Sequence, residues 1–301
     1  MEGRAVRDLG REGEGKEEAM GGLRRVDAHQ HFWRYGSDGY GWIGEGMEAL
    51  KRDFLPDGLR LELDGQGVYG TVAVQARSSE AETDFLLGLA AAHPWILAVV
   101  GWIDLRAGDL EARLEARAAS AILKGYRHPV QDEPSPSAFL EDGRFNRGVE
   151  ALQRRGKVYE VLVRSGDLPA AVAFCGRHDR GPLVLDHLGK PDVRNGSAAA
   201  WRGRVKPLAA LEHVSCKLSG LITEAEWRAW DGRDLLPYLD AALECFGPER
   251  LLFGSDWPVC LLSGTYAQVR GLAEAATASL SESEREAVWG GNACRVYGLN
   301  L

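Results

Sequence analysis

The sequence predicts a single α/β domain folded as a closed (β/α)8 barrel of the TIM type. Short β-branched or aliphatic runs alternate with amphipathic stretches of helical length, a pattern typical of parallel βαβ units. Eight such runs occur in a chain of 301 residues, which is long enough for a barrel of roughly 250 residues. No Gly-x-Gly-x-x-Gly motif follows the first run, so an open dinucleotide-binding sheet loses its main support.

The chain divides into two parts by composition. Residues 1–24 are rich in Gly, Glu and Arg and nearly lack large apolar side chains, so we expect a disordered extension there. The barrel is expected to span residues 25–301. The sequence leaves open whether translation starts at Met1 or at Met20.

The expected elements follow from the alternation of these runs. In chain order the predicted strands cover residues 25–29, 70–75, 96–102, 122–126, 157–163, 183–186, 214–217 and 250–254. The stretches between them predict helices over residues 81–92, 110–119, 145–155, 170–177, 204–211, 235–246 and 266–279, and a last helix after residue 281. Ser79-x-x-Glu82 and Ser281-x-x-Glu284 have the capping-box pattern that begins a helix.

Composition and charge exclude several classes of protein. Apolar residues make up 45% and charged residues 27% of the chain, the balance of an average globular domain. The net charge of −8 argues against nucleic acid or an anionic membrane as a partner, because both require a basic face. The longest apolar run, residues 95–103, is too short to span a bilayer.

The cysteines and the N-terminus indicate the compartment. The five cysteines are widely spaced and form no Cys-x-x-Cys pair, which suits reduced thiols and disfavours a cysteine-ligated zinc. The N-terminus lacks the apolar core of a signal peptide. We therefore expect a cytoplasmic protein.

His29 and His31 form the most informative motif of the chain. They lie two residues apart at the end of the first expected strand, so their side chains share a face and converge. Two converging neutral imidazoles form half of a divalent-metal site or one wall of a polar pocket. A pair of ordinary strand histidines is the alternative.

Polar side chains follow the C-terminal ends of the other strands, where barrels of this kind carry their active sites. Asp256 follows the eighth strand, which lies beside the first in a closed barrel, so it should approach the histidine pair. A carboxylate there can ligate a metal or act as a general base, and a turn residue is the alternative. His187 follows the sixth strand, where a functional position competes with a satisfied core histidine.

Five segments at the strand ends carry a specific pattern: residues 27–33 (DAHQHFW), 124–134 (KGYRHPVQDEP), 186–191 (DHLGKP), 216–221 (CKLSGL) and 253–258 (FGSDWP). Together they resemble the amidohydrolase superfamily of the amidohydrolase-2 type, in its branch of sugar-lactone hydrolases that act on L-fucono- or L-rhamnono-lactones. The similarity covers essentially all of residues 25–301 and ends with Gly-Gly-Asn-Ala at 290–293.

The resemblance implies a metal-dependent-hydrolase-like barrel with metal ligands, or their remnants, at His29, His31, His187 and Asp256. The chain departs from the binuclear members, since Arg127 and His128 stand where a carbamylated lysine would end the fourth strand. One divalent ion, with Zn²⁺ favoured, or none is therefore expected. Asp256 would act as general base, while a metal or the three histidines polarise the lactone carbonyl.

A sugar lactone is neutral and carries many hydroxyls, so its site needs paired donors and acceptors beside an apolar platform. We expect polar contacts from Gln75, Asp104, Arg127, His128 and Glu160. Trp33 and Trp102 are candidates to stack on a sugar face, with packing in the core as the alternative. Arg127 also has a structural alternative, an ion pair with Glu160 or Asp104.

The predicted function is hydrolysis of a sugar lactone, a small-molecule substrate, to its hydroxy acid. The alternative is metal-dependent decarboxylation of an unsaturated carboxylic acid on the same scaffold. A sugar-binding barrel without chemistry is a third hypothesis, disfavoured because three histidines and an aspartate with ligand character occur together. A homo-oligomer is left open.

Overall fold

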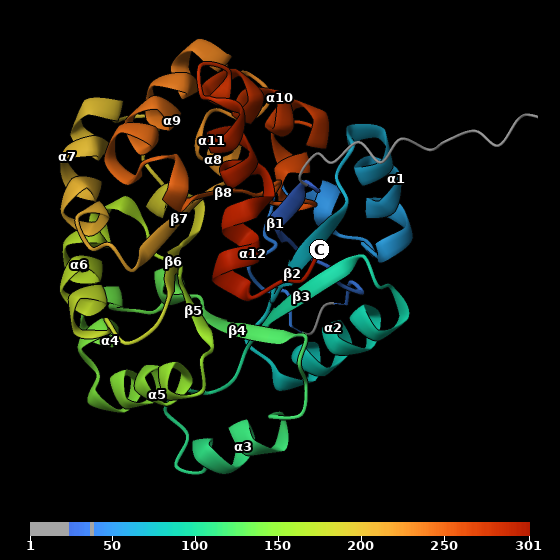
Figure 1. Cartoon of the computed structure of the whole chain (residues 1–301), viewed down its shortest axis with the longest axis vertical. Helices are drawn as coiled ribbons and strands as arrows, with labels where there is room; N and C mark the ends of the chain where they lie inside the picture. The colour runs from blue at the N-terminus through green and yellow to red at the C-terminus, as the bar shows by residue number, and fades with distance from the viewer. Residues whose placement is uncertain (1–23, 37–38) are drawn as a thin grey trace, which may run out of the picture.

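Eight parallel strands form the centre of the molecule and pair in chain order (Figure 1). The computed structural model describes residues 24–36 and 39–301. The strands are β1 (Val26–Gln30), β2 (Gly70–Val74), β3 (Ile96–Gly101), β4 (Leu123–His128), β5 (Val158–Val161), β6 (Leu183–Leu185), β7 (Val214–Leu218) and β8 (Leu251–Phe253). The predicted (β/α)8 barrel is confirmed. Apart from Arg24, the segment expected to be a disordered extension lies outside the described residues.

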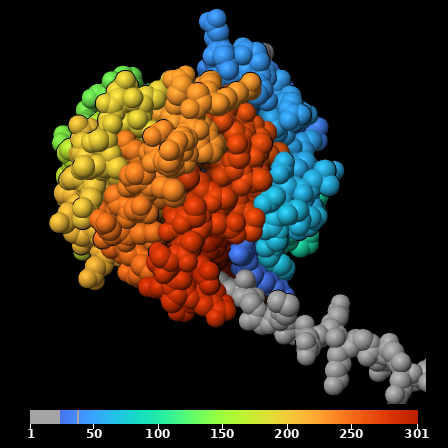
Figure 2. Space-filling view, turned by 90° about the horizontal axis from the view of Figure 1, so that it is seen from above, coloured from blue at the N-terminus to red at the C-terminus, as the bar shows by residue number. Residues whose placement is uncertain are grey.

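Helices surround the strands on all sides. They are α1 (Pro56–Gln66), α2 (Glu80–Ala92), α3 (Leu110–Ala116), α4 (Pro136–Glu141), α5 (Gly143–Arg154), α6 (Leu168–Arg177), α7 (Ala198–Ala209), α8 (Leu221–Glu224), α9 (Gly232–Phe246), α10 (Tyr266–Thr277), α11 (Glu282–Glu286) and α12 (Asn292–Tyr297). Blue α1 and orange-red α10 lie next to each other, so the beginning and the end of the barrel meet (Figure 2). Among the described residues, no helix combines the length and apolar character needed to cross a membrane.

The barrel closes between β1 and the segment that follows β8. The His31 N–H donates to the Trp257 carbonyl at 2.7 Å, and the Asp256 N–H donates to the His29 carbonyl at 2.8 Å. Asp27 Oδ1 joins the two segments as well, because it accepts the N–H groups of His29 at 3.1 Å and of the residue before Asp256 at 2.9 Å. Closure therefore brings the predicted site residues of the first and eighth strands into one place.

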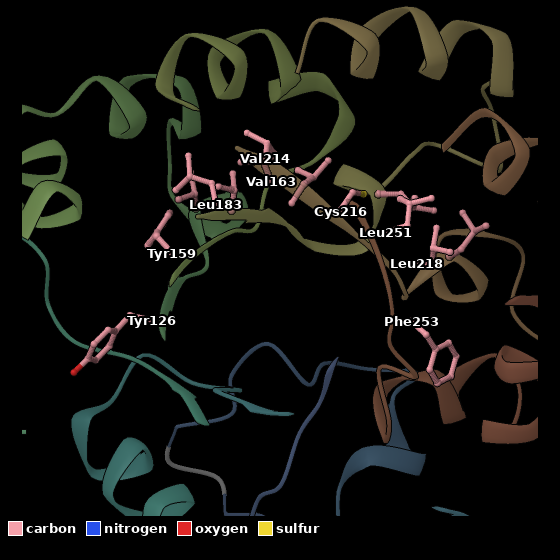
Figure 3. Close-up of a cluster of buried hydrophobic side chains, with 14 of the residues drawn as sticks. Tyr126, Tyr159, Val163, Leu183, Val214, Cys216, Leu218, Leu251 and Phe253 are labelled. Carbon is pink, nitrogen blue, oxygen red and sulfur yellow. The ribbon is translucent and has the colours of Figure 1, made fainter. Parts of the chain in front are cut away.

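Alternation along the strands divides the core into two layers. Outward side chains such as Leu183, Val214, Cys216, Leu251 and Phe253 pack between the strands and the helices (Figure 3). The inward side chains are smaller aliphatic residues, and they form a separate cluster inside the barrel. This pattern leaves the C-terminal ends of the strands free for polar groups.

Helix α12 lies across one end of the barrel (Figure 1). Its residues Ala293, Val296 and Tyr297 pack against the inner cluster. The Tyr297 hydroxyl reaches farther inside and donates to Glu160 Oε1 at 2.5 Å. The helix thus closes the interior on the side away from the site and also contacts a buried carboxyl group.

Two local expectations differ from the structure. Helix α1 is absent from the predicted helices, because Gly58 and Gly65 weaken the helical pattern although Pro56 suits a first turn. The capping box at Ser79 is wrong: its side chain makes no cap hydrogen bond, and Glu82 instead accepts the N–H groups of residues 76 and 77. The capping box at Ser281 is confirmed.

Candidate active site

Three imidazoles and one carboxylate meet at the C-terminal end of the barrel. His29 Nε2 lies 3.2 Å from His31 Nε2, and Asp256 Oδ1 lies 3.3 Å from His31 Nε2. The same carboxylate oxygen is 3.9 Å from Nε2 of His29 and 3.9 Å from Nε2 of His187. All four side chains are buried. The residues that the sequence singled out as ligands therefore form one cluster, which we call the His–Asp cluster.

Two members of the His–Asp cluster have a backbone that L-residues rarely adopt. His187 has φ 50° and Asp256 has φ 56°, and Leu188 and Lys190 in the same loop also have positive φ. Gly220 leaves room for this loop, since a Cβ at that position would stand 2.5 Å from His187 Nδ1. Such conformations cost on the order of 1–3 kcal/mol each and concentrate at functional sites.

Hydrogen bonds fix one proton position in the cluster. His31 Nδ1 lies 2.8 Å from the Val74 carbonyl, which only accepts, so Nδ1 carries a proton, and in the neutral ring Nε2 presents a lone pair. His29 faces donors at both ring nitrogens, because Lys217 Nζ lies 2.9 Å from Nδ1 and Arg127 Nη1 lies 3.2 Å from Nε2. Its Nδ1 also lies 3.5 Å from an acceptor, Asp186 Oδ1. His187 Nδ1 lies 2.9 Å from a serine hydroxyl, that of Ser219.

Burial controls the ionisation of the cluster. It lowers the pKa of His187 to about 4. Burial, together with the ammonium of Lys217, holds the pKa of His29 well below its usual range. For Asp256, burial raises the pKa, but His187 and His31 outweigh it and leave the pKa below its ordinary value. At neutral pH the cluster therefore holds an ionised carboxylate beside the neutral imidazoles of His29 and His187.

Four ionisable side chains lie beneath the cluster and form what we call the buried floor: Arg127, Glu160, Asp186 and Lys217. Lys217 Nζ lies 2.7 Å from Glu160 Oε1 and 3.2 Å from Asp186 Oδ1. Arg127 Nη1 donates to Asp186 Oδ2 at 3.0 Å and lies 3.2 Å from His29 Nε2. The floor therefore supports His29 at both ring nitrogens.

The two acids of the buried floor differ in ionisation. Burial raises the pKa of Asp186, but Lys217 and His29 outweigh it and hold that pKa well below its usual range. Burial and the neighbouring Asp186 raise the pKa of Glu160 to about 7. Arg127 pairs with Asp186 rather than with the two partners considered from the sequence, Glu160 and Asp104.

A cavity of about 1040 Å³ opens above the His–Asp cluster. Its base includes His31, His187 and Asp256, and its walls come from the loops that follow most of the strands. Trp42 and Trp227 supply aromatic surface in these walls. Their indole N–H groups donate to backbone carbonyls at 2.8 and 2.9 Å, so both rings are anchored. The cavity thus has the His–Asp cluster at its bottom and both polar and aromatic side chains in its walls.

The cavity contains two of the residues that the sequence proposed for substrate binding. Gln75 and Arg127 line it. Trp33 does not, because it is fully buried in the core and donates to the Arg52 carbonyl at 2.9 Å. Glu160 lies in the buried floor, out of reach of the cavity.

The remaining three proposed substrate residues lie outside the cavity lining: Trp102 and Asp104 follow β3, and His128 is the last residue of β4. The Trp102 indole donates to His128 Nδ1 at 3.1 Å, and His128 Nε2 lies 2.7 Å from Glu133 Oε1. Asp104 accepts the Arg106 N–H at 2.9 Å. Each of these side chains thus has a structural partner.

Several cavity residues carried no recognised signal in the sequence. Trp42, Arg77, Lys190, Glu224 and Trp227 all line the cavity. Four of them lie in loops, where neither periodicity nor strand position marks a residue. Lys190 belongs to the segment DHLGKP that carries the family resemblance, but nothing in that pattern marks it as a wall residue.

The His–Asp cluster meets the spatial requirement of a metal site. Tetrahedral zinc with bonds of about 2.1 Å places its ligands about 3.4 Å apart. Nε2 of His29, Nε2 of His31 and Oδ1 of Asp256 are separated by 3.2, 3.3 and 3.9 Å. A neutral imidazole nitrogen and an ionised carboxylate oxygen each offer a lone pair to a metal. The residues therefore fit one ion.

A barrel with histidines after its first and sixth strands and an aspartate after its eighth defines a class of metal-dependent and related hydrolases. A sequence model described as amidohydrolase matches residues 26–299. The chain belongs to this amidohydrolase family.

Similar proteins of known name cover nearly the whole chain. L-fucono-1,5-lactonase of Burkholderia multivorans is 51% identical over 290 residues, 93% of this chain and 97% of that protein. L-fucono-1,5-lactonase of Burkholderia ambifaria is 37% identical, over 92% of this chain and 96% of that protein. A crystal structure of a Burkholderia multivorans amidohydrolase with bound zinc is 51% identical, has a TM-score of 0.89, and matches over 92% of this chain and 100% of that one.

Proposed function

We propose that this protein is a lactonase that opens a sugar lactone to its hydroxy acid, with L-fucono-1,5-lactone as the leading substrate. The observation that carries the proposal is the His–Asp cluster at the base of a polar and aromatic cavity. The names of the two similar proteins support the substrate class. The decarboxylase alternative is not favoured, because these relatives are named as lactonases.

The residues of the cluster suit addition of water to a carbonyl. Asp256 is ionised and takes a proton from the attacking water, as a new C–O bond forms at the lactone carbonyl carbon. The ring C–O bond then breaks, and the proton passes to the ring oxygen, which becomes a hydroxyl. No covalent bond to the protein is formed.

Hydrogen-bond donors at the bottom of the cavity stabilise the oxyanion that develops on the carbonyl oxygen. Ser219 can donate to His187 Nδ1, which leaves the His187 Nε2–H free to donate into the cavity. Arg127 is a second donor at the cavity base. His31 has a different role, since its Nε2 is an acceptor. One preorganised donor is typically worth about 3–4 kcal/mol of barrier.

A divalent ion is part of the proposal, with zinc as the candidate. His29, His31 and Asp256 would hold it, with His187 beside them. When bound, it would polarise the lactone carbonyl as a Lewis acid. The Arg127 guanidinium, 3.2 Å from His29 Nε2, puts positive charge next to the same position and weakens cation binding. We therefore propose a removable metal.

Free thiols support a cytoplasmic location as part of the same proposal. All five cysteines are free, and three of them are buried. Thiols persist in reducing compartments.

The function is tested with a panel of aldono-1,4- and 1,5-lactones, with acid release followed by a pH indicator. We expect turnover of L-fucono-1,5-lactone above the spontaneous rate and no CO₂ release from unsaturated carboxylic acids. Absence of enzymatic acid release from every lactone would overturn the proposal.

The metal is tested by binding rather than by activity. Zn²⁺ is titrated into chelator-treated protein in weakly buffered solution, against a chromogenic chelator. We expect one ion at most and at least tenfold weaker binding in His31→Ala. Binding that is unaffected by His31→Ala would place the ion elsewhere.

A further inference from the structure

The cavity wall formed by the segments after β6 and β7 combines charged groups of both signs with an aromatic ring. It contains a lysine, two acids, an arginine, a threonine and a tryptophan: Lys190, Asp192, Arg194, Thr223, Glu224 and Trp227. Paired donors and acceptors next to one aromatic face are what a polyhydroxylated ring requires, since hydroxyls both donate and accept while the ring carbons present C–H groups. This wall is not part of the His–Asp cluster.

Within this wall, Lys190 and Glu224 form an ion pair across two loops. Lys190 Nζ lies 3.4 Å from Glu224 Oε1, and each side chain is only 20% exposed. The distance is longer than that of a tight charged hydrogen bond, so both groups retain capacity for another partner. A comparable pair of the cavity, Arg164 with Asp132 at 3.5 Å, is 56% and 48% exposed and hence largely screened by water.

The backbone holds Lys190 firmly. Its φ is 47°, at the end of the left-handed loop that begins with His187, and its N–H donates to the His187 carbonyl at 2.8 Å. Its carbonyl accepts the Ser165 N–H at 3.3 Å. A non-glycine residue kept in this conformation indicates a requirement for its side chain at this place.

The pair also lies near the reacting end of the cavity. Lys190 follows His187 by three residues, its N–H donates to the His187 carbonyl, and both residues line the same cavity as Asp256. A ring whose carbonyl lies over the cluster can thus reach the pair with its hydroxyls.

We propose that Lys190 and Glu224 are specificity-determining residues that bind two neighbouring hydroxyls of the sugar lactone, with Trp227 against the C–H face of the ring. One hydroxyl accepts from the ammonium of Lys190, and the other donates to the carboxylate of Glu224. The inference rests on the proposed lactonase function and adds to it the part of the site that distinguishes a sugar lactone from a plain one.

The experiment compares two six-membered lactones, L-fucono-1,5-lactone and δ-valerolactone, which has no hydroxyls. We expect Lys190→Met and Glu224→Gln to lower kcat/KM for the sugar lactone by about 10- to 100-fold, the range of a lost charge-assisted hydrogen bond. Both variants should leave kcat/KM for δ-valerolactone nearly unchanged. The preference for the sugar compound is measured a second time, by comparing the inhibition constants of the two ring-opened acids.

The Glu224→Gln variant and one control variant keep the outcome interpretable. Glu224 lies in α8, away from the left-handed backbone, so Glu224→Gln tests the pair even where Lys190→Met fails to fold. Glu226→Gln is the matched control, because Glu226 is 72% exposed and lies outside the cavity lining. We expect it to behave as the wild type.

Each other result has a definite meaning. Equal losses on both lactones would overturn the inference, because the pair would then act on the reacting centre. Unchanged selectivity in both variants would overturn it as well. A wild-type protein that opens none of the lactones of the panel would instead refute the proposed function.

Discussion

At the scale of single residues, Asp256 connects the backbone of the site to its chemistry. Its φ of 56° turns the carboxylate toward His31 and His187, and its N–H group closes the barrel on His29. Asparagine tolerates the left-handed region well, so the amide replacement keeps this geometry and removes only the basic oxygen.

For this reason we expect Asp256→Asn to lower kcat for the sugar lactone by about 10²- to 10⁴-fold, the usual contribution of a general base. The melting temperature and circular dichroism spectrum should match the wild type. Activity within a few-fold of wild type in a well-folded variant would remove Asp256 from the mechanism.

The pH dependence follows from His187. Its pKa is lowered to about 4, so the imidazole is neutral above that pH and becomes charged as the pH falls through it. We expect kcat/KM in metal-free protein to be flat between about pH 5.5 and 8 and to fall below about pH 4.5, because a charged His187, whose Nε2 lies 3.9 Å from Asp256 Oδ1, makes that carboxylate a weaker base. A decline centred near the ordinary histidine value of 6.5 would show that burial does not control this group.

The His–Asp cluster was predictable residue by residue, whereas the cavity walls were not. His29 lies near the end of β1, and His31, His187 and Asp256 follow strands, whose ends converge in any closed barrel. Trp42 and Trp227 come from irregular segments whose path depends on tertiary contacts. Trp33 shows the converse case, because its position beside the histidines suggested a ligand contact while packing took it into the core.

At the scale of elements, the loop after β2 illustrates how a sequence motif can be read incorrectly. The spacing of Ser79 and Glu82 fits a capping box, but the carboxylate is buried and accepts the N–H groups of Ala76 at 3.0 Å and Arg77 at 2.8 Å. The reason is that these two N–H groups would otherwise lack an acceptor in the loop that forms the cavity wall. Spacing alone does not distinguish the two uses of one glutamate.

Glu82 makes stability depend on pH. Burial raises its pKa from 4.5 to about 7 in the folded protein. Its contribution is therefore fully present below pH 4.5 and is lost as the pH rises through about 7. We expect the wild type to lose on the order of 3 kcal/mol more unfolding free energy than Glu82→Gln between about pH 4.5 and 8.

Chemical unfolding of both proteins across this range measures the difference. Glutamine keeps one oxygen that can accept both N–H groups, so the two variants should be equally stable near the acidic end. Parallel pH profiles of the wild type and Glu82→Gln would contradict the prediction.

At the scale of the whole molecule, the fold was predictable because alternation of strands and helices repeats eight times around one axis. Helix α12 was not, since nothing in its sequence shows that it crosses the barrel and sends Tyr297 to Glu160. That contact joins the two ends of the interior and depends on the closed barrel as a unit.

We expect Tyr297→Phe to lower the free energy of unfolding by about 1–3 kcal/mol, because it deprives a buried carboxyl group of a hydrogen bond. Tyr159→Phe is the matched control: its hydroxyl is buried and has no hydrogen-bond partner among the described residues. Denaturant titration should show a loss for the first variant and none for the second. Equal losses would assign the effect to packing.

The buried floor has a consequence for how this protein can diverge. Arg127, Glu160, Asp186 and Lys217 form ion pairs with one another, and removing one member of such a set leaves a buried charge unpaired at a cost of about 3–5 kcal/mol. Mutational paths through the floor are therefore strongly epistatic: a change in one position survives only with a compensating change in another. New substrate preferences are consequently expected to arise in the cavity walls, one tolerated substitution at a time.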